Sequence, residues 1–130
     1  PLSKRTTGIS SRKRRTGARA GISLFKAELR SLPYQLDMME RHPIGSQAFL
    51  PMTEHPFLVI VAPDEAGRPG RPRAFITAPG EGINLLRSTW HGVLTPLAAP
   101  GLFAVVDRIG EGANLEEFHY PDAWRVVAGG

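Results

Sequence analysis

Proline and glycine divide this chain into short apolar segments, and that division constrains the fold more than any other feature. The sequence contains 14 Gly and 12 Pro in 130 residues. No segment has a long apolar period of 3.6 residues with helix caps, whereas several have the apolar runs of short strands. Short strands about ten residues apart, separated by turns, are typical of an all-β sandwich or barrel.

The clearest strand is the apolar, β-branched run at 56–62, and the next clearest lies at 102–107. Residues 63–72 are rich in Pro, Gly and charge and are expected to form a loop. We expect strands at 22–27, 32–40, 48–52, 56–62, 73–78, 83–86, 91–97, 102–107, 118–120 and 123–127.

Charge is distributed unevenly along the chain. Residues 1–20 carry seven basic side chains and no acidic one, whereas the other 110 residues have a small excess of acidic groups. We therefore expect a flexible basic arm at 1–20 and a single β domain at 21–130. A nucleic-acid-binding arm is the alternative interpretation. No aromatic residue lies between these charges, so we favour a solvated arm and expect no nucleic-acid partner.

The sequence contains no Cys, which excludes disulfides and thiolate metal sites. No apolar run approaches the roughly 18 residues of a membrane helix, and the basic start is not followed by the apolar stretch of a signal peptide. These features lead us to expect a cytoplasmic protein without a membrane partner.

Polar groups gather between two expected strands, from Glu40 to Gln47. If this segment is extended, Glu40 and His42 share one face and Arg41 points to the other. Gln47 follows a Pro-Ile-Gly turn and can return to the first face. The segment is either a shell around a metal or polar substrate, or a solvated turn in which Arg41 pairs with an acid. No His-x-His or His-Glu-x-x-His motif decides between them.

The remaining histidines are treated separately. Trp90 and His91 are compatible with a buried pocket, although a packing Trp beside an exposed His is the commoner arrangement and the one that we favour from these two residues alone. His55 lies in an expected turn and should be exposed, whereas His119 lies between two aromatic residues and should pack in the core.

Several of these segments resemble those of ureidoglycolate lyases. The match runs in order over about residues 21–117, and its longest and most specific motif is Glu-Arg-His-Pro-Ile-Gly-Ser-Gln-Ala-Phe-Leu-Pro-Met. The family usually has a longer segment before Gly21, a Tyr after Asn84 where this chain has Leu85, and His-Pro where it has Gly92 and Val93. The segments that carry the resemblance are 40–52, 73–77, 82–84, 90–91 and 102–108.

The resemblance implies a cupin-like barrel, also called a double-stranded β-helix or jelly roll, with its N-terminal strands missing or altered. It also implies a homodimer that cleaves ureidoglycolate to glyoxylate and urea in allantoin and purine nitrogen catabolism. A divalent metal such as nickel would be held by Glu40, His42, Gln47 and His91. The catalytic residues would be His91, Glu40 and His42, and the substrate-binding residues would be Arg41, Gln47, Arg73, Asn84 and Trp90.

The reaction requires a base for the hydroxyl proton, an acid for the departing urea nitrogen and a cation for the carboxylate. His91 suits the proton transfer, with Glu40 as its partner or as a metal ligand. Arg73 or Arg41 suits the carboxylate. Two alternatives stay open: a non-catalytic cupin that binds a small carboxylate, and an inactive, truncated member of the family.

Overall fold

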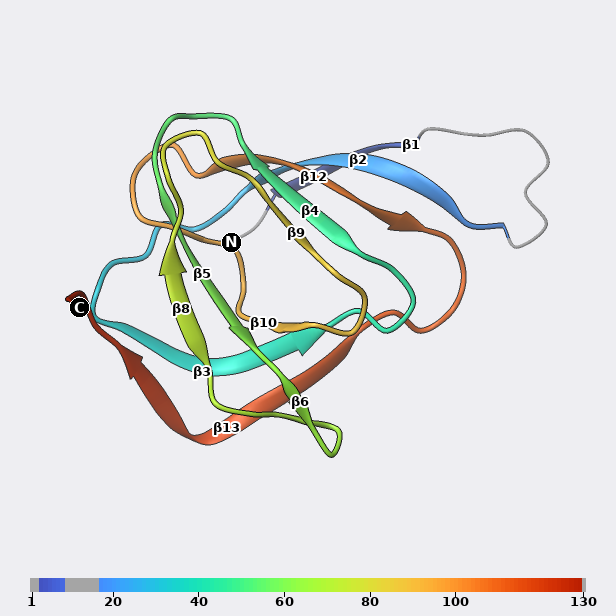
Figure 1. Cartoon of the computed structure of the whole chain (residues 1–130). Coiled ribbons are helices and arrows are strands. Elements are labelled where there is room, and N and C mark those ends of the chain that lie inside the picture. The colour runs from blue at the N-terminus through green and yellow to red at the C-terminus, as the bar shows by residue number, and fades with distance from the viewer. Residues whose placement is uncertain (1–2, 9–16, 130) are drawn as a thin grey trace.

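The computed structural model describes residues 3–8 and 17–129, and within these ranges every helix-or-strand element is a β-strand (Figure 1). The prediction of an all-β protein is confirmed. The antiparallel pairing of its sheets is consistent with a cupin-like sandwich or barrel. Within the described part of the chain, no helix is present that could span a bilayer.

The first sheet has five antiparallel strands in the order β1-β2-β12-β4-β9. Its strands alternate between a core-facing side and an outer side, as expected for a sheet with one solvated face. Ser23, Phe103 and Val105, for example, are buried on the inner side. The bounds are β1 Ser3–Gly8, β2 Arg19–Lys26, β12 Leu102–Ile109, β4 Gln47–Pro51 and β9 Ile83–Leu85.

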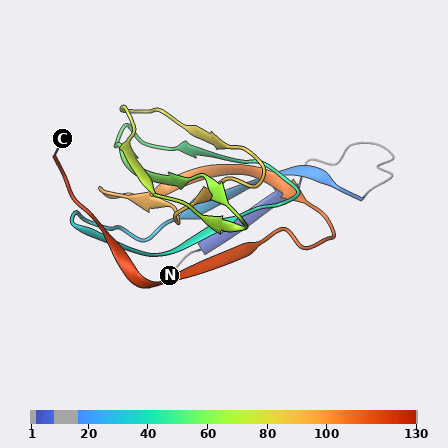
Figure 2. The ribbon, with the colours of Figure 1, turned by 60° about the horizontal axis from the view of Figure 1, so that its bottom comes forward.

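The second sheet has six strands in the order β11-β5-β10-β3-β13, with β8 also paired to β5. Figure 2 shows that β13 bends sharply, and its register with β3 shifts between His119 and Trp124. The bounds are β11 Thr95–Pro96, β5 Phe57–Ala62, β10 Trp90–His91, β3 Tyr34–Arg41, β13 Glu116–Val126 and β8 Arg73–Ile76; a separate hairpin pairs β6 Asp64–Glu65 with β7 Arg68–Pro69.

Strand β5 is shared between two hydrophobic clusters. Phe57 packs in the cluster between the sheets, where its ring meets Phe103 edge to face at 4.9 Å. Leu58, Ile60 and Ala62 belong to the second cluster, with Trp90. Because both faces of β5 are covered, its sequence is continuously apolar rather than alternating.

Three expectations about the strands are corrected. Ser3–Gly8 form a strand paired with β2, although residues 1–20 were expected to contain none. The loop expected at 63–72 contains the short β6–β7 hairpin, and the two strands expected near the C-terminus are one bent strand. Residues 9–16 lie outside the described part of the chain, so the flexibility of the arm stays a prediction.

Candidate active site

The register of two strands brings an acid and an imidazole together. Glu40 on β3 lies directly opposite His91 on β10, and residues opposite each other in an antiparallel pair project to the same face. His42 follows the end of β3. One ligand atom from each of Glu40, His42 and His91 lies within 4.8 Å of the other two.

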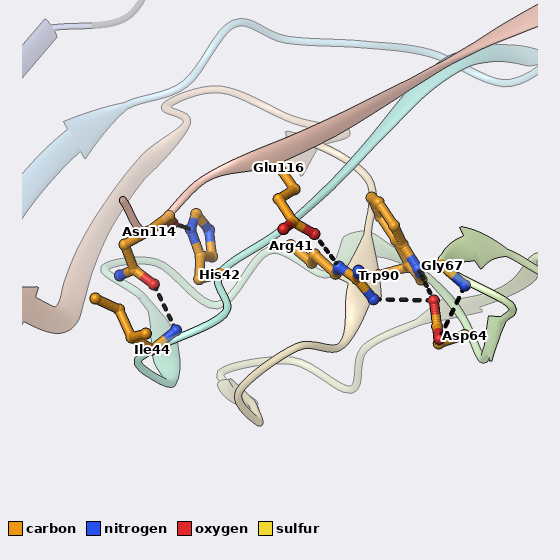
Figure 3. Close-up of polar contacts among 8 residues, drawn as sticks. All are labelled: Arg41, His42, Ile44, Asp64, Gly67, Trp90, Asn114 and Glu116. Carbon is orange, nitrogen blue, oxygen red and sulfur yellow. Dashed lines mark hydrogen bonds and ion pairs between the residues drawn. The ribbon is translucent and has the colours of Figure 1, made fainter. Parts of the chain in front are cut away.

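Both histidine rings are held in one tautomer. Nδ1 of His42 lies 2.8 Å from the Asn114 carbonyl oxygen (Figure 3), and Nδ1 of His91 lies 2.8 Å from the Gly92 carbonyl oxygen. A carbonyl oxygen only accepts, so each Nδ1 carries the hydrogen and each neutral ring keeps a lone pair on Nε2. Both Nε2 atoms are buried and have no hydrogen-bond partner among the described residues.

Burial shifts the pKa values of His91 and Glu40. It lowers the pKa of His91 to about 4; the Gly92 carbonyl opposes the shift and the nearby His42 adds to it. Burial also raises the pKa of Glu40, with His42 opposing the shift and Glu117 adding to it. His91 is therefore neutral at physiological pH and presents an acceptor to the site.

Gln47 approaches from the opposite sheet. Its Nε2 donates to Asp107 Oδ2 at 3.1 Å, across the paired positions of β4 and β12. This bond leaves the amide oxygen free, and Gln47 Oε1 is buried with no partner among the described residues. Glu40 and the two histidines that carry the unpaired ring nitrogens offer ligand atoms within 4.8 Å of one another, an arrangement that suits a cation. Gln47, which carries the third unpaired acceptor, lines the same cavity as Glu40.

Glu40 and Gln47 line a cavity of about 290 Å³ between the sheets. Its other walls include Phe25, Phe49 and Val93. Glu28 and Arg30 also line it, and Arg30 is the one cation among the described lining residues. A mainly apolar cavity with a few polar groups is the usual form of a small-molecule site.

Three of the expected substrate-binding residues, Arg41, Trp90 and Asn84, point away from the cluster. Arg41 and Trp90 are on the other face of their sheet, where both side chains donate to Asp64, because neighbours along a strand point to opposite sides. Asn84 is exposed and lies opposite Ala48, not opposite Gln47. Arg73 is exposed on β8, but it pairs with Val61, which pairs with His91, so Arg73 lies on the same sheet face as His91 and Glu40. The positions of Arg41, Trp90 and Asn84 do not support contact with the substrate, and the role expected for Arg73 stays a prediction.

Sequence reasoning missed Arg30. This residue lies in the segment between β2 and β3, where its backbone nitrogen donates to the Pro96 carbonyl at 2.9 Å. Its guanidinium forms an ion pair with Glu28 at 3.3 Å. The only signal was a Glu and an Arg two residues apart, which is too common to indicate a site.

The other two histidines do not contribute. His55 is exposed, as expected. His119 was expected in the core, but 71% of its side chain is exposed and it pairs with Glu117 at 3.3 Å. The two aromatic neighbours of His119 face inward, and period-two alternation turns His119 outward.

Comparison with known proteins identifies relatives across most of the chain. A family model described as ureidoglycolate lyase matches residues 2–127. A ureidoglycolate lyase of Rhodobacter capsulatus is 65% identical over 103 residues, covering 79% of this chain and 64% of that protein.

Two further relatives agree. A ureidoglycolate lyase of a Chelativorans species is 58% identical over 109 residues, covering 84% of this chain and 66% of that protein. Ureidoglycolate lyase 2 of Rhizobium meliloti is 53% identical over 109 residues, covering 84% of this chain and 67% of that protein. The match therefore spans slightly under two thirds of the first two relatives' lengths. On the family model and these identities, the chain belongs to the ureidoglycolate lyase family.

Proposed function

We propose that this chain cleaves ureidoglycolate to glyoxylate and urea. The observation that supports this most is the convergence of Glu40, His42 and His91 with Gln47 beside a cavity that also contains one arginine. Ureidoglycolate combines a carboxylate with a hydroxyl and a urea nitrogen on one carbon, and these groups match the cation, the carboxylate and the acceptors of the cavity.

Glu40 carries the proton in this proposal. Its carboxylate accepts the hydroxyl proton, the carbonyl of glyoxylate forms, and the carbon–nitrogen bond breaks. The proton then passes to the departing nitrogen, which leaves as urea. The raised pKa of Glu40 favours this exchange, because it makes the carboxylate a stronger base toward the hydroxyl and leaves more of the carboxyl protonated near neutral pH. The sequence suggested His91 for the proton transfer, but burial lowers the pKa of His91 and so disfavours its imidazolium form.

Arg30 takes the role of carboxylate binder that the sequence suggested for Arg41 or Arg73. A guanidinium binds a carboxylate through two parallel hydrogen bonds. In the free protein Glu28 forms an ion pair with this group, so the substrate carboxylate would compete with Glu28 for it.

A divalent cation, nickel among them, fits the donor set. In an alternative role, Glu40 would hold it together with His42 and His91, with Gln47 Oε1 as a further oxygen ligand, because the unpaired Nε2 and Oε1 atoms are buried acceptors. When bound, the cation would lower the pKa of an oxygen that it coordinates.

The activity is tested by incubating the purified chain with ureidoglycolate and measuring glyoxylate and urea separately. We expect equimolar products, and we expect Glu40→Gln to lower kcat by about 100-fold or more, the usual contribution of acid–base catalysis. Glu111→Gln, on an exposed loop residue, is the matched control. Products at the uncatalysed rate with the unmodified chain would reject the proposal.

A non-catalytic member of the family is the second candidate, because a cavity with one arginine suffices to bind a small carboxylate. Calorimetry with glyoxylate separates the two. Binding of glyoxylate without formation of urea from ureidoglycolate supports the binding protein.

Further proposals concern assembly and location. We propose that the protein is a cytoplasmic homodimer. An exposed apolar row on the outer side of the five-stranded sheet supports a self-association surface; it includes Ile22, Leu24, Leu50 and Met52, which are 37–55% exposed. Light scattering of the unmodified chain and of Leu24→Glu tests it, and a monomeric unmodified chain rejects it.

A further inference from the structure

Behind the candidate site, on the other face of the six-stranded sheet, two side chains donate to one oxygen atom. Arg41 Nη1 lies 2.9 Å from Asp64 Oδ1, and Trp90 Nε1 lies 3.0 Å from the same atom. The Arg41 guanidinium also lies 4.4 Å from the centre of the Trp90 ring. Glu116 Oε1 accepts from Arg41 Nε at 2.6 Å. Figure 3 shows Arg41 placed between Glu116 and Asp64, with Trp90 at the same carboxylate.

The two donors are chain neighbours of the site residues. Arg41 stands between Glu40 and His42, and Trp90 precedes His91. The register between β10 and β3 consists of the single pair His91–Glu40, so their backbones are joined over a very short length. The Ser88 backbone nitrogen also donates to the His42 carbonyl at 2.9 Å. Asp64 adds a side-chain connection, through the residues next to the His91–Glu40 pair.

Asp64 is itself well placed to hold both donors. It begins the β6–β7 hairpin, and its second oxygen, Oδ2, accepts from the Gly67 backbone nitrogen at 3.3 Å. The hydrogen bond from Trp90 is the largest of the effects that lower the pKa of Asp64. The carboxylate is therefore charged at neutral pH and oriented by its own turn.

We propose that Asp64 is a positioning residue, which fixes the separation of Glu40, His42 and His91 by joining β3 and β10 from behind. This inference rests on the proposed function of the site but concerns its geometry. Asp64 would act through other residues, because its hydrogen bonds join it to Arg41 and Trp90, which flank the site, and to Gly67 of its own hairpin.

Loss of the Asp64 carboxylate should change the geometry of the site more than the free energy of unfolding of the protein. The side chain of Asp64 is 43% exposed, and exposed ion pairs contribute little to folding. Partners that orient ligands from outside a metal site, in contrast, typically change metal affinity or activity by 10–100-fold.

The test compares Asp64→Ala with Glu65→Ala, the adjacent exposed acid of the same hairpin. Calorimetry measures the nickel affinity of the metal-free protein. Assays with ureidoglycolate give kcat and KM, and thermal melting reports on folding. We expect Asp64→Ala to weaken nickel binding about tenfold or more and to lower kcat more than it changes KM. Glu65→Ala should match the unmodified chain, and melting should be similar in both variants.

A second variant tests whether Asp64 acts through Trp90. Trp90→Phe removes one donor to Asp64 but keeps an aromatic ring beneath Arg41. We expect a smaller loss of nickel affinity, and we expect the double variant to lose no more than Asp64→Ala alone, because residues in one network are not additive. Fully additive losses would contradict the proposal. Trp90→Phe also serves if Asp64→Ala does not fold.

Crystal structures make the inference independent of the activity. If Asp64→Ala leaves Glu40, His42 and His91 where they are in the unmodified chain, the proposal is overturned, whether or not ureidoglycolate is cleaved. If the three residues move apart and the unmodified chain proves inactive, the positioning role stands and the proposed reaction fails.

Discussion

Glu40 and His91 face each other across two paired antiparallel strands, β3 and β10. Their separation is therefore set by backbone register rather than by a flexible loop. Groups on regular elements hold a more reproducible geometry than groups on loops. His42, beyond the strand end, is instead fixed by Asn114, which accepts from its ring and, through Oδ1, from the Ile44 backbone nitrogen at 2.9 Å.

This arrangement predicts one divalent-cation site per chain. His42→Asn or His91→Asn removes a buried ring nitrogen that the cation would contact, so each should weaken nickel binding by about 100-fold or more, at least as much as loss of an outer partner. Equilibrium dialysis of the metal-free protein measures this. His55→Asn, on an exposed histidine, is the control, and equal losses in all three variants would show that nickel binds elsewhere.

Stability of the metal-free protein should depend on pH through His91. Its pKa is lowered to about 4 in the folded state from 6.5, so the unfolded chain binds the extra proton between these values. Stability should therefore fall as the pH drops below about 6.5, by about 2 kcal/mol from pH 7 to pH 5. Urea unfolding at both pH values, in the presence of EDTA, measures the change.

His91→Gln isolates this contribution, because it removes the titrating ring and leaves the other groups in place. Glu40, whose pKa is raised, acts in the opposite direction near its own pKa, since the folded state then binds the proton more strongly. A pH dependence as steep in His91→Gln as in the unmodified chain would assign the effect to other groups.

Arg30 and Glu28 should have opposite effects on carboxylate binding. Arg30→Met removes the cation and should weaken glyoxylate binding by about tenfold, equivalent to about 1.4 kcal/mol. Glu28→Gln removes the competing carboxylate and should tighten it by a smaller factor, because the pair is partly exposed. Calorimetry measures both. Weaker binding in Glu28→Gln would mean that Glu28 orients Arg30 rather than competing for it.

Gly101 should not tolerate a side chain. A Cβ there would lie 2.5 Å from the Ala27 carbonyl oxygen and 2.8 Å from Pro96 Cγ. Gly101→Ala should therefore lower the free energy of unfolding by about 1–3 kcal/mol, as overpacking does. At Gly92 the nearest atoms would be 3.5 Å away, an ordinary contact. Gly92→Ala is the control, and an equal loss in both variants by chemical denaturation would contradict the steric explanation.

Most strands could be predicted from the sequence because apolar alternation and Pro/Gly turns are local signals. The β5 strand and the β12 strand carry long apolar runs and were found near their true bounds. Strand β1 could not be found in this way. Its polar sequence gives no such signal, and its strand conformation depends on pairing with β2.

The site was only partly predictable. Glu40, His42 and Gln47 were singled out as polar groups between two expected strands and His91 as the neighbour of Trp90, before the resemblance suggested roles for them. Strand periodicity correctly placed Arg41 on the opposite face from Glu40. The suggestion that Arg41 binds substrate considered residue type and disregarded that geometry. Arg30 reaches the cavity from a connecting segment, where no periodicity indicates the direction of a side chain.

Strand β5 joins both hydrophobic clusters through alternate side chains. If either cluster unfolded alone, one face of β5 would lose its packing contacts and be exposed to water. The amides of β5 should therefore exchange with deuterium only through global unfolding. The two hydrophobic clusters should unfold as one cooperative unit.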